Sequence, residues 1–155
     1  MKINIKKLVL SIIITFLIGN FFAIFINIGD AYLNLNKGVN VPGFIFPIVW
    51  SVIYTIMGIS LYLILESKNY NKDKSIIIYF FQLLINSFWT LWFFKFHLFL
   101  FSFLWIIFLI ILVLFMIVNF YKINRLAGLL NILYLLWLLF AAYLNFSIVI
   151  LNYNF

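Results

Sequence analysis

Five long apolar stretches, almost free of charged residues, restrict this chain to one class of fold. They cover residues 8–28, 46–65, 75–94, 98–121 and 127–151. Each has about 20 residues or more, and a helix of that length crosses a hydrocarbon core of about 30 Å. Strands of a membrane barrel would instead alternate polar and apolar residues over about ten positions. We therefore predict an all-α integral membrane protein, in which a single domain, 1–155, forms a bundle of five transmembrane helices.

Composition supports the same class, with the lipid bilayer as the solvent. The chain is 68% hydrophobic and 8% charged, whereas a soluble domain carries about 25% charged residues. Lys2, Lys6 and Lys7 resemble the basic start of a secretion signal. The apolar stretch that follows is too long for one and lacks a clean cleavage site, so we expect it to be retained. The chain has no cysteine, which excludes disulfide and thiolate chemistry.

The basic residues predict the orientation in the membrane. Lys37 and Lys95 lie on one side of the predicted bundle. The opposite side holds the rest of the basic residues, in the N-terminal tail and in the second and fourth loops: Lys2, Lys6, Lys7, Lys68, Lys72, Lys74, Lys122 and Arg125. Because basic loops stay in the cytoplasm, we expect a cytoplasmic N-terminus and an external C-terminus. The net charge of +7 is spread over these loops, so nucleic acid is not an expected partner.

Few residues could carry acid–base or metal chemistry. Asp30, Glu66 and Asp73 lie in or beside loops, and His97 is the only histidine. A metal site needs several ligands that converge on one point, and an ion-coupled transporter needs an ionisable group inside the membrane. We therefore predict no metal site and no cofactor, and the sequence argues against a hydrolase, a metalloenzyme and a proton-coupled transporter.

Aromatic and amide side chains recur instead at helical spacing. Phe46, Trp50 and Tyr54 follow one another at four-residue intervals, which places them on one helical face. Two further faces carry Gln82, Asn86, Trp89 and Phe93 in the third stretch, and Asn131, Tyr134, Trp137, Ala141 and Asn145 in the fifth. Amides deep in a membrane span should face protein or a cavity. The faces therefore indicate either an aromatic-walled cavity or ordinary packing with an interfacial aromatic belt.

Two other segments have weaker signals. The fourth stretch is almost wholly apolar, with Trp105 in its midst, and is expected to form a lipid-facing perimeter. The loop 30–43 is longer than most helix connections, so it is either a lid over the bundle or a plain connector.

Three blocks resemble motifs of the TspO/MBR family, the tryptophan-rich sensory proteins, which include the translocator protein or peripheral benzodiazepine receptor of animals. PGFIFPIVWSVIYTIMG at 42–58, QLLINSFWTLWFF at 82–94 and YLLWLLFAAYLNFSIVILN at 134–152 are similar to its second, third and fifth helices. The resemblance implies a five-helix bundle, often a homodimer, that binds porphyrins such as protoporphyrin IX and synthetic benzodiazepine-type compounds. The implied ligand-binding residues are Tyr32, Pro42, Phe46, Trp50, Tyr54, Asn86, Trp89, Trp137 and Ala141.

The chain also departs from the family pattern. Family first loops often carry a tryptophan beside Tyr32 and a Pro-Trp-x-Pro-Pro segment, whereas Ala31 and KGVNVPG stand here, so we expect a lid of different shape. Family third helices often have a proline after the Trp-Thr pair, where this chain has Leu91. No basic residue follows Arg125, so the proposed cholesterol motif is incomplete around Tyr143 and cholesterol is not an expected ligand.

The resemblance implies three functions. The first is a membrane receptor or binding protein for tetrapyrroles, acting in porphyrin handling or stress signalling. The second is an enzyme that degrades porphyrin with light and oxygen, in which Trp50 and Trp137 would be the catalytic residues. The third is a facilitative tetrapyrrole transporter. We favour binding, because no residue in the spans could manage protons or a metal.

Overall fold

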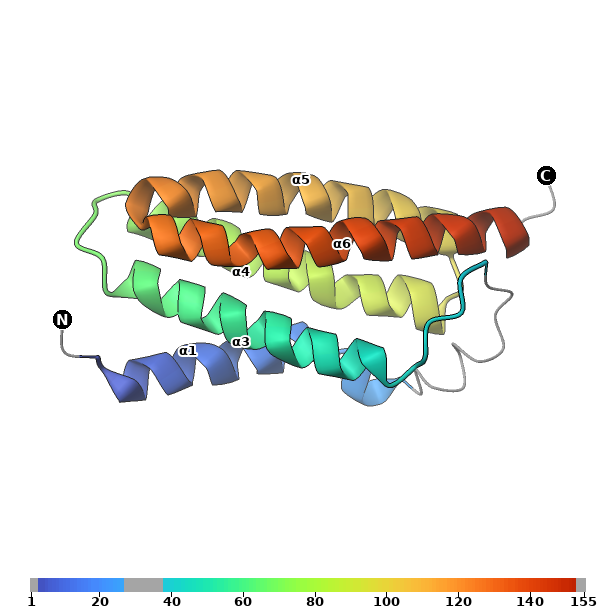
Figure 1. Cartoon of the computed structure of the whole chain (residues 1–155), viewed down its shortest axis with the longest axis horizontal. Helices are drawn as coiled ribbons and strands as arrows, with labels where there is room; N and C mark the ends of the chain where they lie inside the picture. The colour runs from blue at the N-terminus through green and yellow to red at the C-terminus, as the bar shows by residue number, and fades with distance from the viewer. Residues whose placement is uncertain (1–2, 27–37, 153–155) are drawn as a thin grey trace.

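The computed structural model describes residues 3–26 and 38–152, and all the regular elements in this part of the chain are helices (Figure 1). The elements, in order, are α1 Ile5–Gly19, the short 3₁₀-helix η1 Ala23–Phe25, α3 Ile45–Leu65, α4 Lys72–Thr90, the π-helical segment η2 Leu91–Lys95, α5 Phe99–Ile123 and α6 Arg125–Asn152. The prediction of an all-α fold is therefore confirmed.

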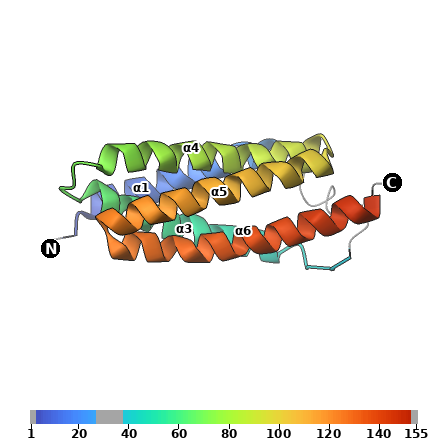
Figure 2. The ribbon, with the colours of Figure 1, turned by 90° about the horizontal axis from the view of Figure 1, so that it is seen from above.

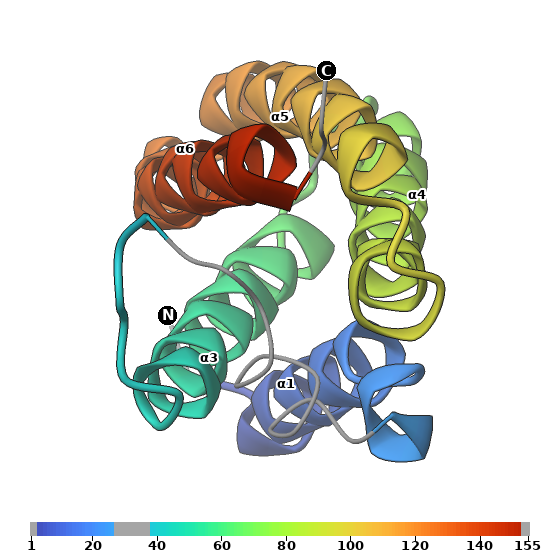
Figure 3. The ribbon, with the colours of Figure 1, turned by 90° about the vertical axis from the view of Figure 1, so that its right-hand side faces the viewer.

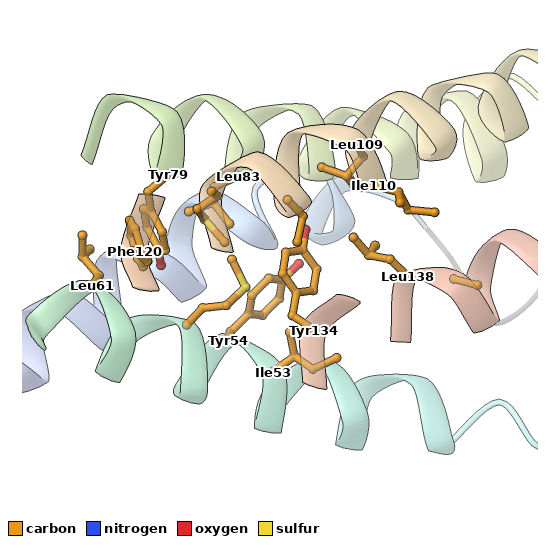
Figure 4. Packing of buried hydrophobic residues seen from close by; sticks show 14 of the residues in the cluster. Ile53, Tyr54, Leu61, Tyr79, Leu83, Leu109, Ile110, Phe120, Tyr134 and Leu138 are labelled. Atoms are coloured by element: carbon orange, nitrogen blue, oxygen red, sulfur yellow. The ribbon is translucent and has the colours of Figure 1, made fainter. Parts of the chain in front are cut away.

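The helices run along one common long axis (Figures 1 and 2). Seen from the end of that axis, they follow one another around the bundle in the order α1, α3, α6, α5, α4 (Figure 3). Each helix packs on the next in this ring, and α4 closes it by packing on α1. Their inner faces enclose a main core, which includes Tyr54, Tyr79 and Tyr134 (Figure 4), and a smaller cluster of Phe93, Phe99, Ile148 and Val149.

Four stretches of described helix are long and apolar enough to cross a membrane: α3, α4 together with η2, α5 and α6. With α1, which has 15 residues, they form the predicted membrane bundle. The expected spans 46–65, 75–94, 98–121 and 127–151 lie along these four helices and differ from them only by a few residues at the ends.

The first span departs from the expected range 8–28. Helix α1 ends at Gly19, and η1 follows after a turn, while residues 27 and 28 lie outside the described part of the chain. The side chain of Asn20 donates to the carbonyl of Phe16 at 3.1 Å. Such local bonds from an asparagine offer the backbone an alternative to continued helix. The apolar content of the sequence alone does not show that α1 ends at Gly19.

Polar side chains inside the bundle pair across helices. The hydroxyls of Thr15 and Tyr79 are 2.6 Å apart, Asn131 donates to Ser60 at 2.6 Å, and the Tyr134 hydroxyl donates to Gln82 at 3.1 Å. All the amides expected to avoid lipid are buried: Gln82, Asn86, Asn131 and Asn145. A polar group in hydrocarbon is costly unless it is hydrogen-bonded, so these pairs hold the helices in register.

The expectation that the fourth span forms a lipid-facing perimeter is only half right. One face of α5 is buried in the core, including Leu109, Val113, Met116 and Phe120. Trp105 donates its indole N–H to the carbonyl of Ile85 in α4 at 2.8 Å. Lipid tails and the protein interior are both apolar, so a uniformly apolar sequence does not distinguish a perimeter helix from a packed one.

Candidate ligand-binding cavity

A cavity of about 500 Å³ lies inside the bundle, at the end where α3 begins and where α4 and α6 end. Its size falls within the range of about 300–1,000 Å³ that is typical of small-molecule sites. Helices α3, α4 and α6 supply most of the wall, and the rest comes from the end of α1, from η1, from η2 and from Gly43.

Most of the residues predicted from the sequence come together here. The cavity wall includes Phe46, Trp50, Tyr54, Asn86, Trp89, Trp137 and Ala141. Pro42 is not part of the wall, although its neighbour Gly43 is. Tyr32 lies outside the described residues.

The aromatic face of α3 forms one side of the cavity. The ring of Trp50 stacks on that of Tyr54, with centroids 5.2 Å apart and planes at 26°. Trp137 of α6 meets Trp50 edge to face at 6.3 Å and Phe46 at 6.1 Å. Pro47 falls in the first turn of α3, where a missing N–H breaks no helical bond. The four-residue spacing thus builds a continuous π-rich wall.

Tyr54 is fixed by two hydrogen bonds at the floor of the cavity. Its hydroxyl donates to the carbonyl of Gly19 at 3.0 Å and accepts from the Asn86 amide at 3.1 Å. These bonds tie α3 to α1 and α4 at one point. A Cβ at Gly19 would lie 2.4 Å from the Tyr54 ring, so only glycine leaves the ring in this position.

A second polar cluster positions Trp89. In the amide orientation that satisfies its neighbours, the Asn145 oxygen accepts from Trp89 Nε1 at 3.2 Å and from Ser102 Oγ at 3.0 Å. The Asn145 nitrogen then donates to the carbonyl of Phe99 at 3.1 Å. Trp89 in turn stacks on Phe93 with centroids 5.0 Å apart. This cluster joins α4, α5 and α6 beside the cavity and holds the indole plane against its wall.

Several wall residues were not predicted. Besides Gly19 and Gly43 they are Asn20, Ala23, Pro47, Ser51, Thr90, Phe93, Phe94, Leu144, Asn145 and Ile148. The sequence faces already contained Phe93 and Asn145, but no pattern indicated Phe94. Phe93 and Phe94 both belong to η2, which is π-helical: the Phe96 N–H bonds to the carbonyl of Leu91 at 3.0 Å.

The wall carries no charged side chain, and among the described residues no three histidine, cysteine or carboxylate groups come together as metal ligands. Its polar side-chain groups are hydroxyls, amides and indole N–H groups, and Tyr54, Asn86 and Asn145 are buried. Such a site suits a flat, apolar, π-rich molecule and offers it a few hydrogen bonds.

Comparison with known proteins identifies the family of this chain. Residues 9–151 match the TspO/MBR family. The chain belongs to this family. It is 35% identical to the tryptophan-rich protein TspO of Archaeoglobus fulgidus over 152 residues, which cover 96% of this chain and 99% of that protein. The resemblance drawn from the three sequence blocks is thereby confirmed.

Other TspO/MBR relatives are similar over most of their length. The tryptophan-rich protein TspO of Chlorobaculum tepidum is 32% identical over 115 residues, 73% of each chain. Protein CrtK of Rhodobacter capsulatus is 31% identical over 113 residues, which cover 72% of this chain and 71% of that protein. Family membership and the long apolar helices together make this chain a multi-pass membrane protein.

Proposed function

We propose that this protein binds porphyrins and similar flat hydrophobic ring systems within the membrane. The observation that carries the proposal is the uncharged, aromatic-walled cavity, where Trp50, Trp89 and Trp137 lie around one space of about 500 Å³. A porphyrin presents two large π-faces, which aromatic side chains contact favourably, and a membership in the TspO/MBR family agrees with a ligand of this kind. The proposed role is tetrapyrrole handling or stress signalling.

Titration of protoporphyrin IX into the purified protein in lipid nanodiscs tests the proposal. We expect saturable binding that quenches tryptophan fluorescence. Trp50→Phe and Trp137→Phe should each weaken affinity by less than about tenfold, because phenylalanine keeps most of the contact area and tenfold corresponds to about 1.4 kcal/mol. Trp92→Phe is the matched control, since Trp92 is absent from the cavity wall and should leave affinity unchanged. Partitioning that never saturates would contradict the proposal.

One observation favours a second function, the degradation of bound porphyrin with light and oxygen. Trp50 and Trp137, both readily oxidised indoles, meet at 6.3 Å in the cavity wall. If they take part in such a reaction, Trp50→Phe and Trp137→Phe should abolish bleaching of the complex under illumination in oxygen while porphyrin still binds. Equal bleaching by wild type and both variants would leave binding as the function. Ligand accumulation in sealed vesicles would instead indicate transport.

We further propose that the N-terminus is cytoplasmic and the C-terminus external. The described basic residues support this orientation. Lys95 belongs to the pole of the bundle where α3 begins (Figure 1). The opposite pole, where α1 begins, has the others, at helix ends or in the loop between α3 and α4: Lys6, Lys7, Lys68, Lys72, Lys74, Lys122 and Arg125. The pole where α1 begins also has an ion pair of 2.8 Å between Lys7 and Glu66.

Cysteine labelling checks the orientation, because the natural chain has no cysteine. Tyr70→Cys lies between α3 and α4 at a position that is 94% exposed, and Asn40→Cys lies before α3. An impermeant thiol reagent on intact cells is expected to label Asn40→Cys alone, and to reach Tyr70→Cys only after permeabilisation. The reverse pattern would show the opposite orientation.

A further inference from the structure

Trp137 lies between two hollows. One is the cavity inside the bundle, and the other is a groove of about 440 Å³ between α3 and α6. Trp137 belongs to the walls of both. The rest of the groove is formed by Val49, Val52, Ile53 and Ile56 of α3 and by Leu133, Leu136 and Phe140 of α6. A single indole therefore stands where the inner cavity and the outer groove adjoin.

The groove faces the hydrocarbon of the bilayer. Both of its helices are membrane spans, all of its residues are apolar, and Val52 and Leu136 are 53% and 56% exposed. Lipid chains, or another apolar molecule dissolved among them, are what can occupy such a surface. A flat hydrophobic ligand concentrates in the bilayer, because leaving water is favourable in proportion to its apolar area. The groove would meet that ligand at high local concentration.

No described hydrogen bond tethers the indole of Trp137. Its Nε1 is buried without a partner among the described residues, whereas Trp89 donates to Asn145 at 3.2 Å and Trp105 donates to Ile85 at 2.8 Å. Ring contacts, including one with Phe140 of the groove at 5.6 Å, and packing against the apolar core hold Trp137 in place. A change of its side-chain rotamer therefore breaks no described hydrogen bond, unlike a movement of Trp89 or Trp105.

We propose that the groove between α3 and α6 is a membrane-side entrance to the cavity, with Trp137 as the movable partition. A flat apolar ligand reaches the groove from the hydrocarbon, contacts Val52 and Leu136, and passes into the cavity when the indole turns aside. It leaves by the same path. This inference rests on the proposed binding function and adds the route by which that site exchanges its ligand with the bilayer.

Filling the groove tests the entrance. Val52→Trp adds bulk at a position that belongs to the groove and not to the cavity wall. The substitution obstructs the entrance but alters neither the free nor the ligand-bound cavity. Both the association and dissociation rates of protoporphyrin IX should therefore fall by about tenfold or more, while Kd stays within about twofold. Leu136→Trp should act in the same way from α6. The rates are measured by rapid mixing of protein in nanodiscs with porphyrin-loaded vesicles, followed by tryptophan quenching.

Leu139→Trp is the matched control: Leu139 is a 49% exposed residue of α6 that belongs to neither hollow. Its rates should equal those of wild type. A second comparison uses two cavity tryptophans: Trp137→Leu and Trp50→Leu both lose an indole, but only the first should raise the association rate. Saturable binding with unchanged rates in Val52→Trp and Leu136→Trp would overturn the entrance alone. A wild type that binds no porphyrin would contradict the proposed function, and the entrance with it.

Discussion

Replacing both Trp50 and Trp137 by alanine is expected to weaken protoporphyrin IX binding by at least about 100-fold. The two rings meet at 6.3 Å on the neighbouring helices α3 and α6 of the cavity wall, so we expect one flat ligand to contact both. Truncating a tryptophan that is a hot spot of a binding site costs about 2 kcal/mol or more, and each 1.4 kcal/mol is tenfold in Kd. The losses should combine because alanine removes both the stacking surface and the closed shape of the wall.

Equilibrium titration in nanodiscs measures this effect, with the single variants beside the double. Trp92→Ala removes an indole that lies on α4–η2 outside the cavity wall, among Phe88, Phe101 and Trp105. It should retain wild-type affinity, which would show that the loss of binding is specific to the tryptophans of the cavity wall. Unchanged affinity in the double variant would eliminate the cavity as the binding site.

Gly58→Leu is expected to destabilise the fold by about 3 kcal/mol, at the upper end of the usual cost of overpacking a core. A Cβ at Gly58 would lie 2.5 Å from Cα and 2.8 Å from Cγ1 of Ile12, so α1 would have to move away from α3. Small residues at such contacts let membrane helices approach closely. Displacement of α1 would also shift the Gly19 carbonyl away from Tyr54 and weaken ligand binding.

Denaturation of the purified protein, by heat or by a denaturing detergent, measures this loss. Gly43→Leu is the control, because a Cβ at Gly43 meets nothing within 4 Å. It should leave stability near that of wild type. If Gly58→Leu is as stable as Gly43→Leu, the close approach of α1 and α3 at this position is not needed for stability.

The sequence alone was sufficient to predict the membrane class and the shared helical face of Phe46, Trp50 and Tyr54. A chain that is 8% charged cannot cover a water-exposed surface, and helices are the elements that satisfy their own backbone in lipid. The regular spacing of Phe46, Trp50 and Tyr54 placed them on one face of α3, where the structure has them. Gln82 and Asn86 were expected inside because an unpaired amide is costly in lipid, and both are buried.

Other features of the site required the packed bundle. Phe94 belongs to the cavity wall and to the π-helical turn of η2, and no residue pattern predicts that turn. Helix α1 ends at Gly19, inside a stretch that stays apolar to residue 28. The position of Trp137 between a cavity and a groove depends on how α3 and α6 pack together.

One physical reason underlies these differences. In water, the contrast between polar and apolar residues shows which helix face is buried. In a membrane, lipid-facing and interior side chains are both apolar, so that contrast disappears along helices such as α5, whose two faces differ little in composition. The sequence by itself therefore determined that the chain crosses the membrane and that amides inside its spans, such as Gln82 and Asn86, must turn inward. Only the close packing of the helices decided which apolar residues enclose the cavity and which face the lipid.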